Sequence, residues 1–356
     1  MKQKKEVRVL LPSPKPAVWK FQALSVVVVS SFIVLSLVLG FSYLVIQTRQ
    51  VAFEASRATS ATSERDTRTI SFPVGVNPVR KTITENIAVD TYFDTHAPSR
   101  TLAINSNRNW FGRIVQKLAV MDWYQNLASP TGRMLVIASG ERKEEVTEHF
   151  GKILGWSEAE KKVFVDTVTT STPKMSEGTF FPSTYVVARG ATPLDVAPLV
   201  TARFKSEVLS RYKSDVETIV PIKDALIIAS LLEREAYDFE DMRFISGVIW
   251  NRLFIGMNLQ IDATLQYAKA NEHTQSWWPE PVPADKTIRS EFNTYRNDGL
   301  PPAPIANPSL DAILAALNPR KTDCLFYFHD SHAGFHCSKT YSEHVALLRE
   351  YYGKGR

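Results

Sequence analysis

Net charge is almost absent from most of this 356-residue sequence. The first 20 residues hold six of the 42 Lys and Arg residues and one of the 37 Asp and Glu residues, which leaves 36 of each sign for the rest. A nucleic-acid-binding surface needs a local excess of basic residues. The balanced body of the chain therefore argues against a nucleic-acid partner.

Cysteine is scarce as well, and the sequence shows no internal repeat and no low-complexity tract. Cys324 and Cys337 lie on either side of a predicted hairpin. Outside the cytoplasm they can form a disulfide; otherwise they are two small buried side chains. Both alternatives stay open, because a disulfide requires a specific separation of the two Cα atoms.

Charged side chains are also absent from one long apolar run near the N-terminus. Residues 21–47 contain no charged side chain, and about 20 apolar residues are enough to cross a bilayer. The basic block on their N-terminal side predicts a cytoplasmic N-terminus. A cleavable signal peptide has a shorter apolar core, of about 7–15 residues. We therefore predict a single-pass anchor in the cytoplasmic (inner) membrane, with the lipid bilayer as a partner and the rest of the chain on the extracytoplasmic side.

Composition divides the chain into five predicted segments. They are a basic cytoplasmic tail (1–20), a transmembrane helix (21–47), a linker rich in Ser, Thr, Ala and charge (48–69), a small α+β module of unknown role (70–130) and a large domain (131–356).

Short strands and amphipathic helices mix in the large domain without β–α–β alternation, so we predict an α+β fold. Ser157 followed by Glu160 indicates a helix start, and Gly256 a helix end. The expected strands are 133–138 and 180–187, and an aromatic β-hairpin is expected within 324–340. The expected helices are 140–154, 157–168, 192–212, 220–236, 239–253, 310–317 and 342–352. The chain after Gly256 is predicted to be rich in loops.

Two glutamates stand in one of these helices with different neighbours. Residues two apart lie about 200° apart around a helix axis, so Glu233 and Glu235 face different sides. The side chains around Glu235 are the bulkier and more apolar: Ile228, Leu231, Leu232 and Phe239. We expect partial burial to raise the pKa of Glu235, which suits a general acid. Glu233 is expected either to contact main chain or an arginine, or to face water.

The following stretches are rich in amides, hydroxyls and aromatic rings around rigid Pro and Gly turns. Aromatic faces cover the apolar side of sugar rings, and amides bridge sugar hydroxyls. These residue types predict a carbohydrate cleft. The candidate substrate-binding residues are Asn251, Gln260, Asp262, Asn293, Thr294, Tyr295 and Asn307.

The same stretches resemble the membrane-bound endolytic murein transglycosylases, the MltG/YceG-like family, from about Met134 to the C-terminus. The matching blocks are ASLLEREA at 229–236, WNRLFIGMNLQIDAT at 250–264, FNTY at 292–295, GLPPAPIANP at 299–308 and ALNPRKTDCLFY at 316–327. The second glutamate of the family's E-K-E motif corresponds to Glu235. The resemblance therefore implies a YceG-like catalytic domain in which Glu235 is catalytic and Glu233 is structural.

The chain also departs from the family pattern. Ile261, Ala263, Phe292 and Ala303 replace Thr, Pro, Tyr and Gly. The family has G-H-T-F where this chain has the block 334–337, Gly-Phe-His-Cys, so a histidine is displaced by one position. One step along a strand turns a side chain to the opposite face. The family's LysM-like module has no clear match in 70–130.

The resemblance implies a lyase reaction on peptidoglycan glycan strands. Glu235 protonates the oxygen of the β-1,4 bond between N-acetylmuramic acid (MurNAc) and N-acetylglucosamine (GlcNAc), and then takes a proton from the C6 hydroxyl of MurNAc. That hydroxyl attacks its own anomeric carbon and leaves a 1,6-anhydro end, without water, metal or cofactor. The implied role is to end glycan elongation, with cell-wall synthases of the elongation or division machinery as candidate partners.

Three other interpretations stay open. A hydrolytic muramidase cuts the same bond with water and uses two carboxylates, of which Asp262 is the natural second. A catalytically decayed, membrane-anchored cell-wall scaffold also fits the substitutions. His329, His332 and His336 crowd one hairpin together with Asp330, and they are either metal ligands or surface histidines on a turn.

Overall fold

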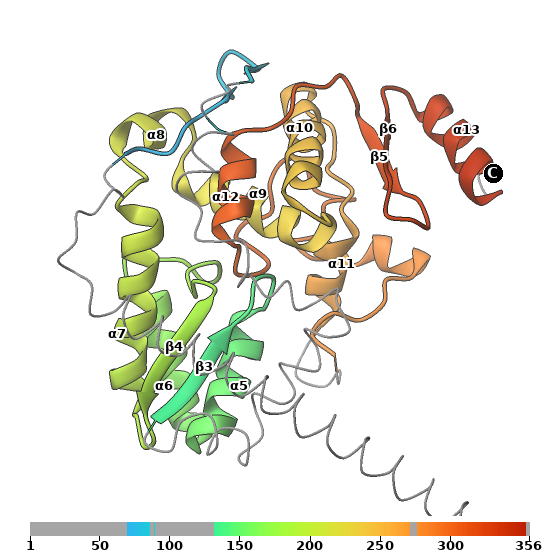
Figure 1. Cartoon of the computed structure of the whole chain (residues 1–356). Coiled ribbons are helices and arrows are strands. Elements are labelled where there is room, and N and C mark those ends of the chain that lie inside the picture. Colours follow the sequence, from blue (N-terminus) through green and yellow to red (C-terminus); the bar gives the residue numbers. More distant parts are fainter. Residues whose placement is uncertain (1–69, 86–88, 90–131, 271–275, 354–356) are drawn as a thin grey trace, which may run out of the picture. The chain divides into compact units, whose positions relative to one another are not determined.

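A computed structural model describes residues 70–85, 89, 132–270 and 276–353 (Figure 1). These residues belong to one compact unit, Ala52–Arg356. The predicted tail, anchor and linker (1–69) lie outside the described residues and stay predictions. None of the helices in the described part of the chain is long and apolar enough to cross a membrane.

A two-stranded antiparallel sheet and three helices form the first hydrophobic core (Figure 1). Strand β3 (Gly132–Ile137) pairs with β4 (Ser183–Ala188) over its whole length. Helices α5 (Lys143–Leu154), α6 (Glu158–Thr169) and α7 (Pro193–Phe204) pack with them. The fully buried side chains include Leu135, Val146, Phe150, Phe164, Phe180, Val196 and Val200. Both predicted strands are confirmed.

The predicted start of α6 is confirmed by its hydrogen bonds. The Ser157 N–H donates to Glu160 Oε2 at 2.8 Å, and Ser157 Oγ accepts from the Glu160 N–H at 3.4 Å. The long helix predicted over 192–212 is present as α7, which passes directly into a π-helical turn, η2 (Lys205–Leu209); the π turn was not predicted. Phe204 and Val208, on either side of the change from α7 to η2, are both buried in the second core.

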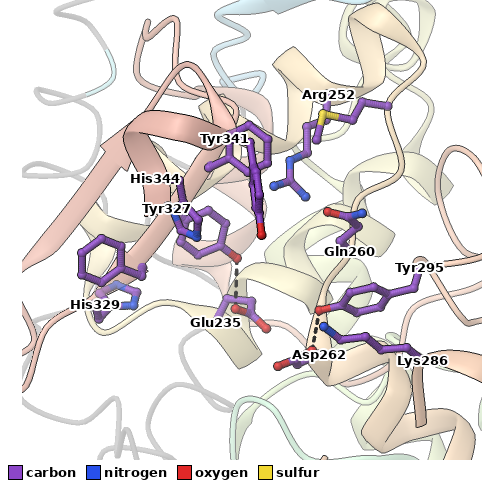
Figure 2. A pocket seen from close by; sticks show the side chains of 13 residues that line it. Glu235, Arg252, Gln260, Asp262, Lys286, Tyr295, Tyr327, His329, Tyr341 and His344 are labelled. Atoms are coloured by element: carbon purple, nitrogen blue, oxygen red, sulfur yellow. Dashed lines mark hydrogen bonds between the residues drawn. The ribbon is translucent and has the colours of Figure 1, made fainter. Parts of the chain in front are cut away.

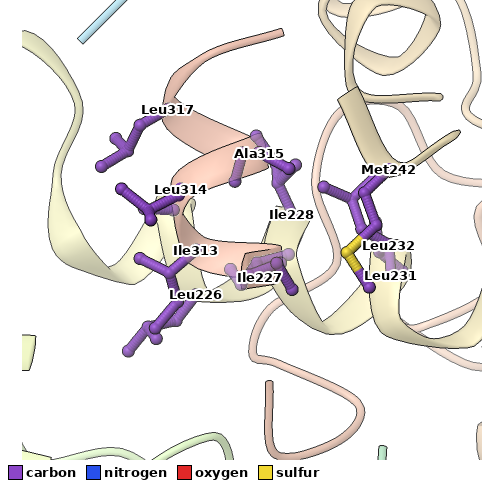
Figure 3. Close-up of a cluster of buried hydrophobic side chains, with 14 of the residues drawn as sticks. Leu226, Ile227, Ile228, Leu231, Leu232, Met242, Ile313, Leu314, Ala315 and Leu317 are labelled. Carbon is purple, nitrogen blue, oxygen red and sulfur yellow. The ribbon is translucent and has the colours of Figure 1, made fainter. Parts of the chain in front are cut away.

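Three further helices build the second core (Figure 3). They are α9 (Ile222–Glu235), α10 (Phe239–Ile255) and α12 (Leu310–Leu317), at or close to their predicted positions. The α9 side chains are buried along most of the helix, which contacts both α10 and α12. The Trp250 indole N–H donates to the Ala316 carbonyl at 2.9 Å and ties α10 to α12. This packing fixes the end of α9, where Glu235 stands.

Residues 70–85 pack onto the same core. Strands β1 (Val76–Asn77) and β2 (Thr82–Ile83) form a short hairpin, and Phe72 is one of the buried core residues. The Gly75 N–H donates to the carbonyl of the last residue of α12 at 2.9 Å. Of the rest of the predicted 70–130 module, only Val89 is described, so the module stays a prediction.

The chain after Gly256 contains more regular structure than its loop-like composition predicts. Gly256 ends α10 with φ 69°, as expected. The structure then adds α11 (Asp262–Lys269) and the 3-10 turn η3 (Pro283–Thr287), and it adds α8 (Ser214–Ile219) earlier in the chain. α11, η3 and α8 have eight, five and six residues, so they are too short to show a clear helical period.

The predicted aromatic hairpin near the C-terminus is confirmed. Strand β5 (Phe326–His329) pairs with β6 (Phe335–Ser338), and α13 (Tyr341–Tyr352) follows. Cys324 and Cys337 form a disulfide, which settles the alternative that the sequence left open. The described residues thus combine helices with three separate two-stranded antiparallel sheets, in agreement with an α+β class.

Candidate active site

A pocket of about 830 Å³ lies between the end of α9, the start of α11 and the β5–β6 hairpin (Figure 2). Two carboxylates, a lysine and an arginine line it, together with rings of Phe, Tyr and His. Its volume is within the common range of small-ligand sites, about 300–1,000 Å³. Four predicted site residues meet here: Glu235, Gln260, Asp262 and Tyr295.

Glu235 is the last residue of α9 and is partly buried. Ile228, Leu231 and Leu232, the apolar helix neighbours named for it in the sequence, are fully buried. The Tyr327 hydroxyl, from β5, donates a hydrogen bond to Glu235 Oε2 at 3.0 Å (Figure 2). Burial and the neighbouring Glu235 charge raise the pKa of Tyr327 well above its usual range, so the phenol remains a donor. The raised pKa expected for Glu235 stays a prediction.

Glu233 points to a different partner. Its Oε2 accepts from the Ser309 N–H at 3.0 Å and from the Ser309 hydroxyl at 2.8 Å. Ser309 is the N-cap of α12, and its Oγ also accepts from the Ala312 N–H at 3.2 Å. Of the contacts the sequence left open, the main-chain one is therefore present. Glu233 joins the end of α9 to the start of α12 and does not line the pocket.

Asp262 and Tyr295 form a second hydrogen-bonded pair in the pocket. The Tyr295 hydroxyl donates to Asp262 Oδ1 at 2.6 Å (Figure 2). Burial and this hydrogen bond raise the pKa of Tyr295. Lys286 Nζ lies 4.7 Å from the centre of the Tyr295 ring, and Gln260 lines the pocket with a left-handed backbone, φ 52°. This pair lies in the same pocket as Glu235 and offers a second carboxylate.

The structure does not bring the other four predicted binding residues, Asn251, Asn293, Thr294 and Asn307, to the pocket. Asn251 donates to two carbonyl groups of the segment before β5, at 2.8 and 3.1 Å. Asn293 donates to two carbonyl groups around η3, at 3.1 and 2.8 Å. Thr294 Oγ1 accepts a hydrogen bond at 3.0 Å from the backbone N–H of Ile261, the residue before α11. Asn307 Oδ1 accepts hydrogen bonds from the backbone N–H groups of Gly178 and Phe180, in the segment before β4. Their described contacts hold the loops around the pocket.

Several pocket residues were not singled out from the sequence: Arg252, Lys286, Tyr327 and His344. Arg252 donates to the Leu325 carbonyl at 2.6 Å and so holds the start of β5; burial lowers its pKa. Tyr327 ends the last family-like block, and this position was the one available signal. Its contact with Glu235 joins residues 92 positions apart, and local sequence patterns carry no information about such a pairing.

The three hairpin histidines do not converge. His329 Nε2 lies 2.8 Å from Asp241 Oδ2, whereas His336 Nε2 lies 2.7 Å from Asp330 Oδ2. The His332 ring contacts the neighbouring serine hydroxyl. Across 70–85, 89, 132–270 and 276–353 there is no group of three or more His, Cys, Asp or Glu side chains placed to hold a metal ion. The geometry of the described hairpin offers no metal site.

Comparisons with known proteins point to the same part of the chain. The family model described as the YceG-like family matches residues 111–350, which include the whole pocket. An endolytic murein transglycosylase of Bacillus subtilis is 35% identical over 197 residues, covering 54% of this chain and 53% of that protein. One from Streptococcus pneumoniae (strain D39) is 34% identical over 154 residues, covering 43% and 28%. The chain thus aligns with about half of the first relative and less of the second.

A crystal structure of a YceG-like protein from Listeria monocytogenes has a similar fold. Its TM-score is 0.54 at 19% sequence identity, and the alignment covers 78% of this chain and 97% of that one. At this identity the likeness concerns the fold alone.

Proposed function

The chain belongs to the YceG-like family, and from this premise we propose that it is an endolytic murein transglycosylase, a lyase that cleaves peptidoglycan glycan strands. Its curated relatives carry that name. The observation that carries the proposal is the position of Glu235 at the end of α9, facing a pocket lined by aromatic rings and bound to Tyr327.

In the proposed reaction one carboxyl group handles both protons. Glu235 protonates the glycosidic oxygen as the bond to the MurNAc anomeric carbon breaks. The C6 hydroxyl of the same sugar then bonds to that carbon and returns its proton to Glu235. No water enters, the product ends in 1,6-anhydroMurNAc, and the acid is regenerated. General acid–base help of this kind contributes roughly 10²–10⁴-fold.

The surroundings of Glu235 support both of its protonation states. The C-terminal end of a helix carries a partial negative charge, which disfavours a carboxylate there and favours the acid. The hydrogen bond donated by Tyr327 favours the carboxylate formed halfway through the reaction. These opposing influences suit a group that must give up a proton and then regain it.

The remaining pocket residues suit a sugar chain. Phe326, Tyr341 and Tyr295 present ring surfaces, which can cover the apolar faces of sugars. Gln260 and Asp262 offer hydrogen-bonding groups, and the Lys286 ammonium adds a positive charge. We propose that these groups hold the strand across Glu235. Asn251, Asn293, Thr294 and Asn307 contribute by supporting the loops.

A hydrolytic muramidase is the second candidate, and it is favoured by a specific observation. Asp262 lines the same pocket as Glu235, and a glycosidase that uses water needs two carboxylates. The Tyr295 hydroxyl already occupies one oxygen of Asp262, which suits a substrate-holding group better than a base. Product masses separate the two candidates, because an anhydro end is lighter than a reducing end by one water.

The test is digestion of purified glycan strands by the full-length chain in detergent, with Glu235→Gln and Glu233→Gln beside it. We expect anhydro products from the wild type and from Glu233→Gln, and none from Glu235→Gln. Normal release of anhydro products by Glu235→Gln contradicts the assignment. Binding without cleavage by the wild type supports the decayed scaffold.

We also propose that residues 21–47 anchor the protein in the inner membrane, so that the catalytic domain faces the extracytoplasmic side. The support is the sequence alone, namely the charge-free run behind a basic tail. Such a position brings the domain to nascent strands and to cell-wall synthases. Protease added to spheroplasts should remove the domain and spare the N-terminal tail; full protection of the domain contradicts this orientation.

A further inference from the structure

Two side chains of β5 dock onto the corner between α9 and α10. Tyr327 and His329 are two positions apart, so they project from the same face of the strand. Tyr327 donates to Glu235, the last residue of α9, at 3.0 Å. His329 Nε2 lies 2.8 Å from Oδ2 of Asp241, in the first turn of α10. The strand is therefore held at two points on the corner that carries Glu235.

Asp241, the partner of His329, is itself held in place by other contacts. Asp241 is 8% exposed, and its Oδ2 also accepts from the Tyr237 N–H at 2.7 Å. The Asp241 N–H donates to the N-cap side chain of Asp238 at 2.9 Å. A carboxylate only accepts hydrogen bonds, so the imidazole donates from Nε2. The Tyr237 ring meets the His329 ring edge-on, with 4.7 Å between centroids.

The other histidine–aspartate pair of the hairpin has a different geometry. His336 Nε2 lies 2.7 Å from Asp330 Oδ2, and its ring packs against Phe328 and Tyr351. Asp330 also accepts from the Gly334 N–H at 2.9 Å. This pair closes the hairpin turn on itself, and the contacts described for it lie within the hairpin and with α13. The two pairs have the same residue types and similar His–Asp distances, but the His336–Asp330 pair is not attached to the helix corner that carries Glu235.

The register of the hairpin places a histidine beside the position of the displaced family histidine. Phe335 occupies the family position, and it pairs directly with His329 on the neighbouring strand. Directly paired residues of an antiparallel ladder project to the same side of the sheet. A histidine is therefore present on that face of the hairpin, carried by β5 instead of β6.

We propose that His329, held by Asp241, is a positioning residue that keeps the Tyr327 hydroxyl on Glu235. This inference rests on the proposed function of that pocket. Arg252 holds the start of β5 through the Leu325 carbonyl, and the His329–Asp241 contact holds its other end. Together they fix the orientation of Tyr327, which lies between them. Without the His329–Asp241 contact the Tyr327 hydroxyl moves off Glu235, and the carboxylate formed during the reaction loses this donor.

The kinetic test compares His329→Ala and His329→Gln with the matched control His336→Gln in the full-length protein. His329→Ala should lower kcat about tenfold, the value of one hydrogen bond to a charged group, and leave KM near wild type. The alkaline limb of its pH–kcat profile should shift to higher pH, as in Tyr327→Phe. The double variant His329→Ala/Tyr327→Phe should have no lower kcat than Tyr327→Phe alone. His329→Gln, which keeps an N–H donor, should recover part of kcat, and His336→Gln should change neither quantity.

A second readout does not depend on activity. Ultraviolet absorbance follows the ionisation of tyrosines as the pH is raised. The wild type and His329→Ala are each paired with the same protein carrying Tyr327→Phe, and the two titration curves of each pair are compared. Burial and Glu235 raise the pKa of Tyr327 well above its usual range, so the wild-type pair should show no difference near pH ~10. In the His329→Ala pair one additional tyrosine should titrate there.

The outcomes separate the two hypotheses. An unchanged pH profile together with an unchanged titration overturns the positioning role, and so does a rise in KM alone, which indicates that His329 touches the substrate. Absence of anhydro products from the wild type overturns the proposed function instead. The titration still tests the docking of β5 in that case.

Discussion

The two ends of the short segment 233–235 show how position decides the role of a carboxylate. Glu233 and Glu235 belong to the same helix turn. Glu233 accepts both hydrogen bonds of Ser309 and joins α9 to α12. Glu235 lines a pocket and accepts from one phenol. The first carboxylate is occupied by the fold, and the second faces space that a substrate can enter.

The difference arises from what packs on each side of α9. On the Glu233 side, the N-terminus of α12 supplies an N–H and a hydroxyl at contact distance. On the Glu235 side, the hairpin supplies ring surfaces and the Tyr327 hydroxyl as a donor. A buried polar group that is fully paired supports structure, whereas one that faces a cavity is available for chemistry.

The largest effect on kcat is expected when the two glutamates are replaced one at a time. Glu235→Gln should lower kcat by roughly 10²–10⁴-fold or more, because it cannot donate the proton. Release of anhydro ends from glycan strands measures this rate. Glu233→Gln should stay close to wild type, since an amide oxygen still accepts from Ser309. Equal losses in the two variants contradict the division of roles.

Removing the donor to Glu235 should have the next largest effect. Tyr327→Phe removes the phenol hydrogen bond to the Glu235 carboxylate, so the pKa of Glu235 should rise. A hydrogen bond to a charged group is worth about 1.5 kcal/mol, which corresponds to roughly one pH unit. The protonated acid then persists to higher pH, and the alkaline limb of the pH–kcat profile should move up by about that amount. A downward shift refutes the role given to Tyr327.

A change at the second pocket carboxylate should cost less. Asp262→Asn keeps the Tyr295 contact and should lower kcat/KM by less than about tenfold, as expected for a neutral substrate contact. Tyr295→Phe, which removes the same hydrogen bond from the other side, is the matched control. A loss as large as that of Glu235→Gln makes Asp262 a partner in catalysis and favours the muramidase.

The smallest effect on activity is expected at Glu233. Glu233→Ala removes the acceptor for Ser309, the N-cap of α12, and should lower the free energy of unfolding by about 1 kcal/mol, as other capping losses do. In a domain of this size that is roughly 2–4 °C in Tm. Calorimetry of Glu233→Ala beside Glu235→Ala checks it. A larger loss of stability in Glu235→Ala would reverse the assigned roles.

Much of the fold was predictable from local patterns. The strongly periodic helices α9, α10 and α12 and the paired strands β3 and β4 lie at or close to their expected positions. The π-helical turn and α11 were not predicted: η2 has only five residues and α11 only eight. Propensity and period carry little information about either.

The site was predictable in part for a similar reason. The apolar stripe around Glu235 is a property of one helix and was visible in the sequence. The partners of Asn251 and Asn307 come from segments more than 70 positions away, so composition suggested sugar contacts where the structure has main-chain contacts. The docking of Tyr327 and His329 on the α9–α10 corner likewise depends on the tertiary fold.

The most direct test of the central claim is digestion of glycan strands by the full-length protein in ¹⁸O-labelled water, with mass analysis of the new ends. Because the C6 hydroxyl of the sugar is the proposed nucleophile, the products should be anhydro ends without ¹⁸O, and Glu235→Gln should make none. Reducing ends that carry ¹⁸O would show that water is the nucleophile and would contradict the account.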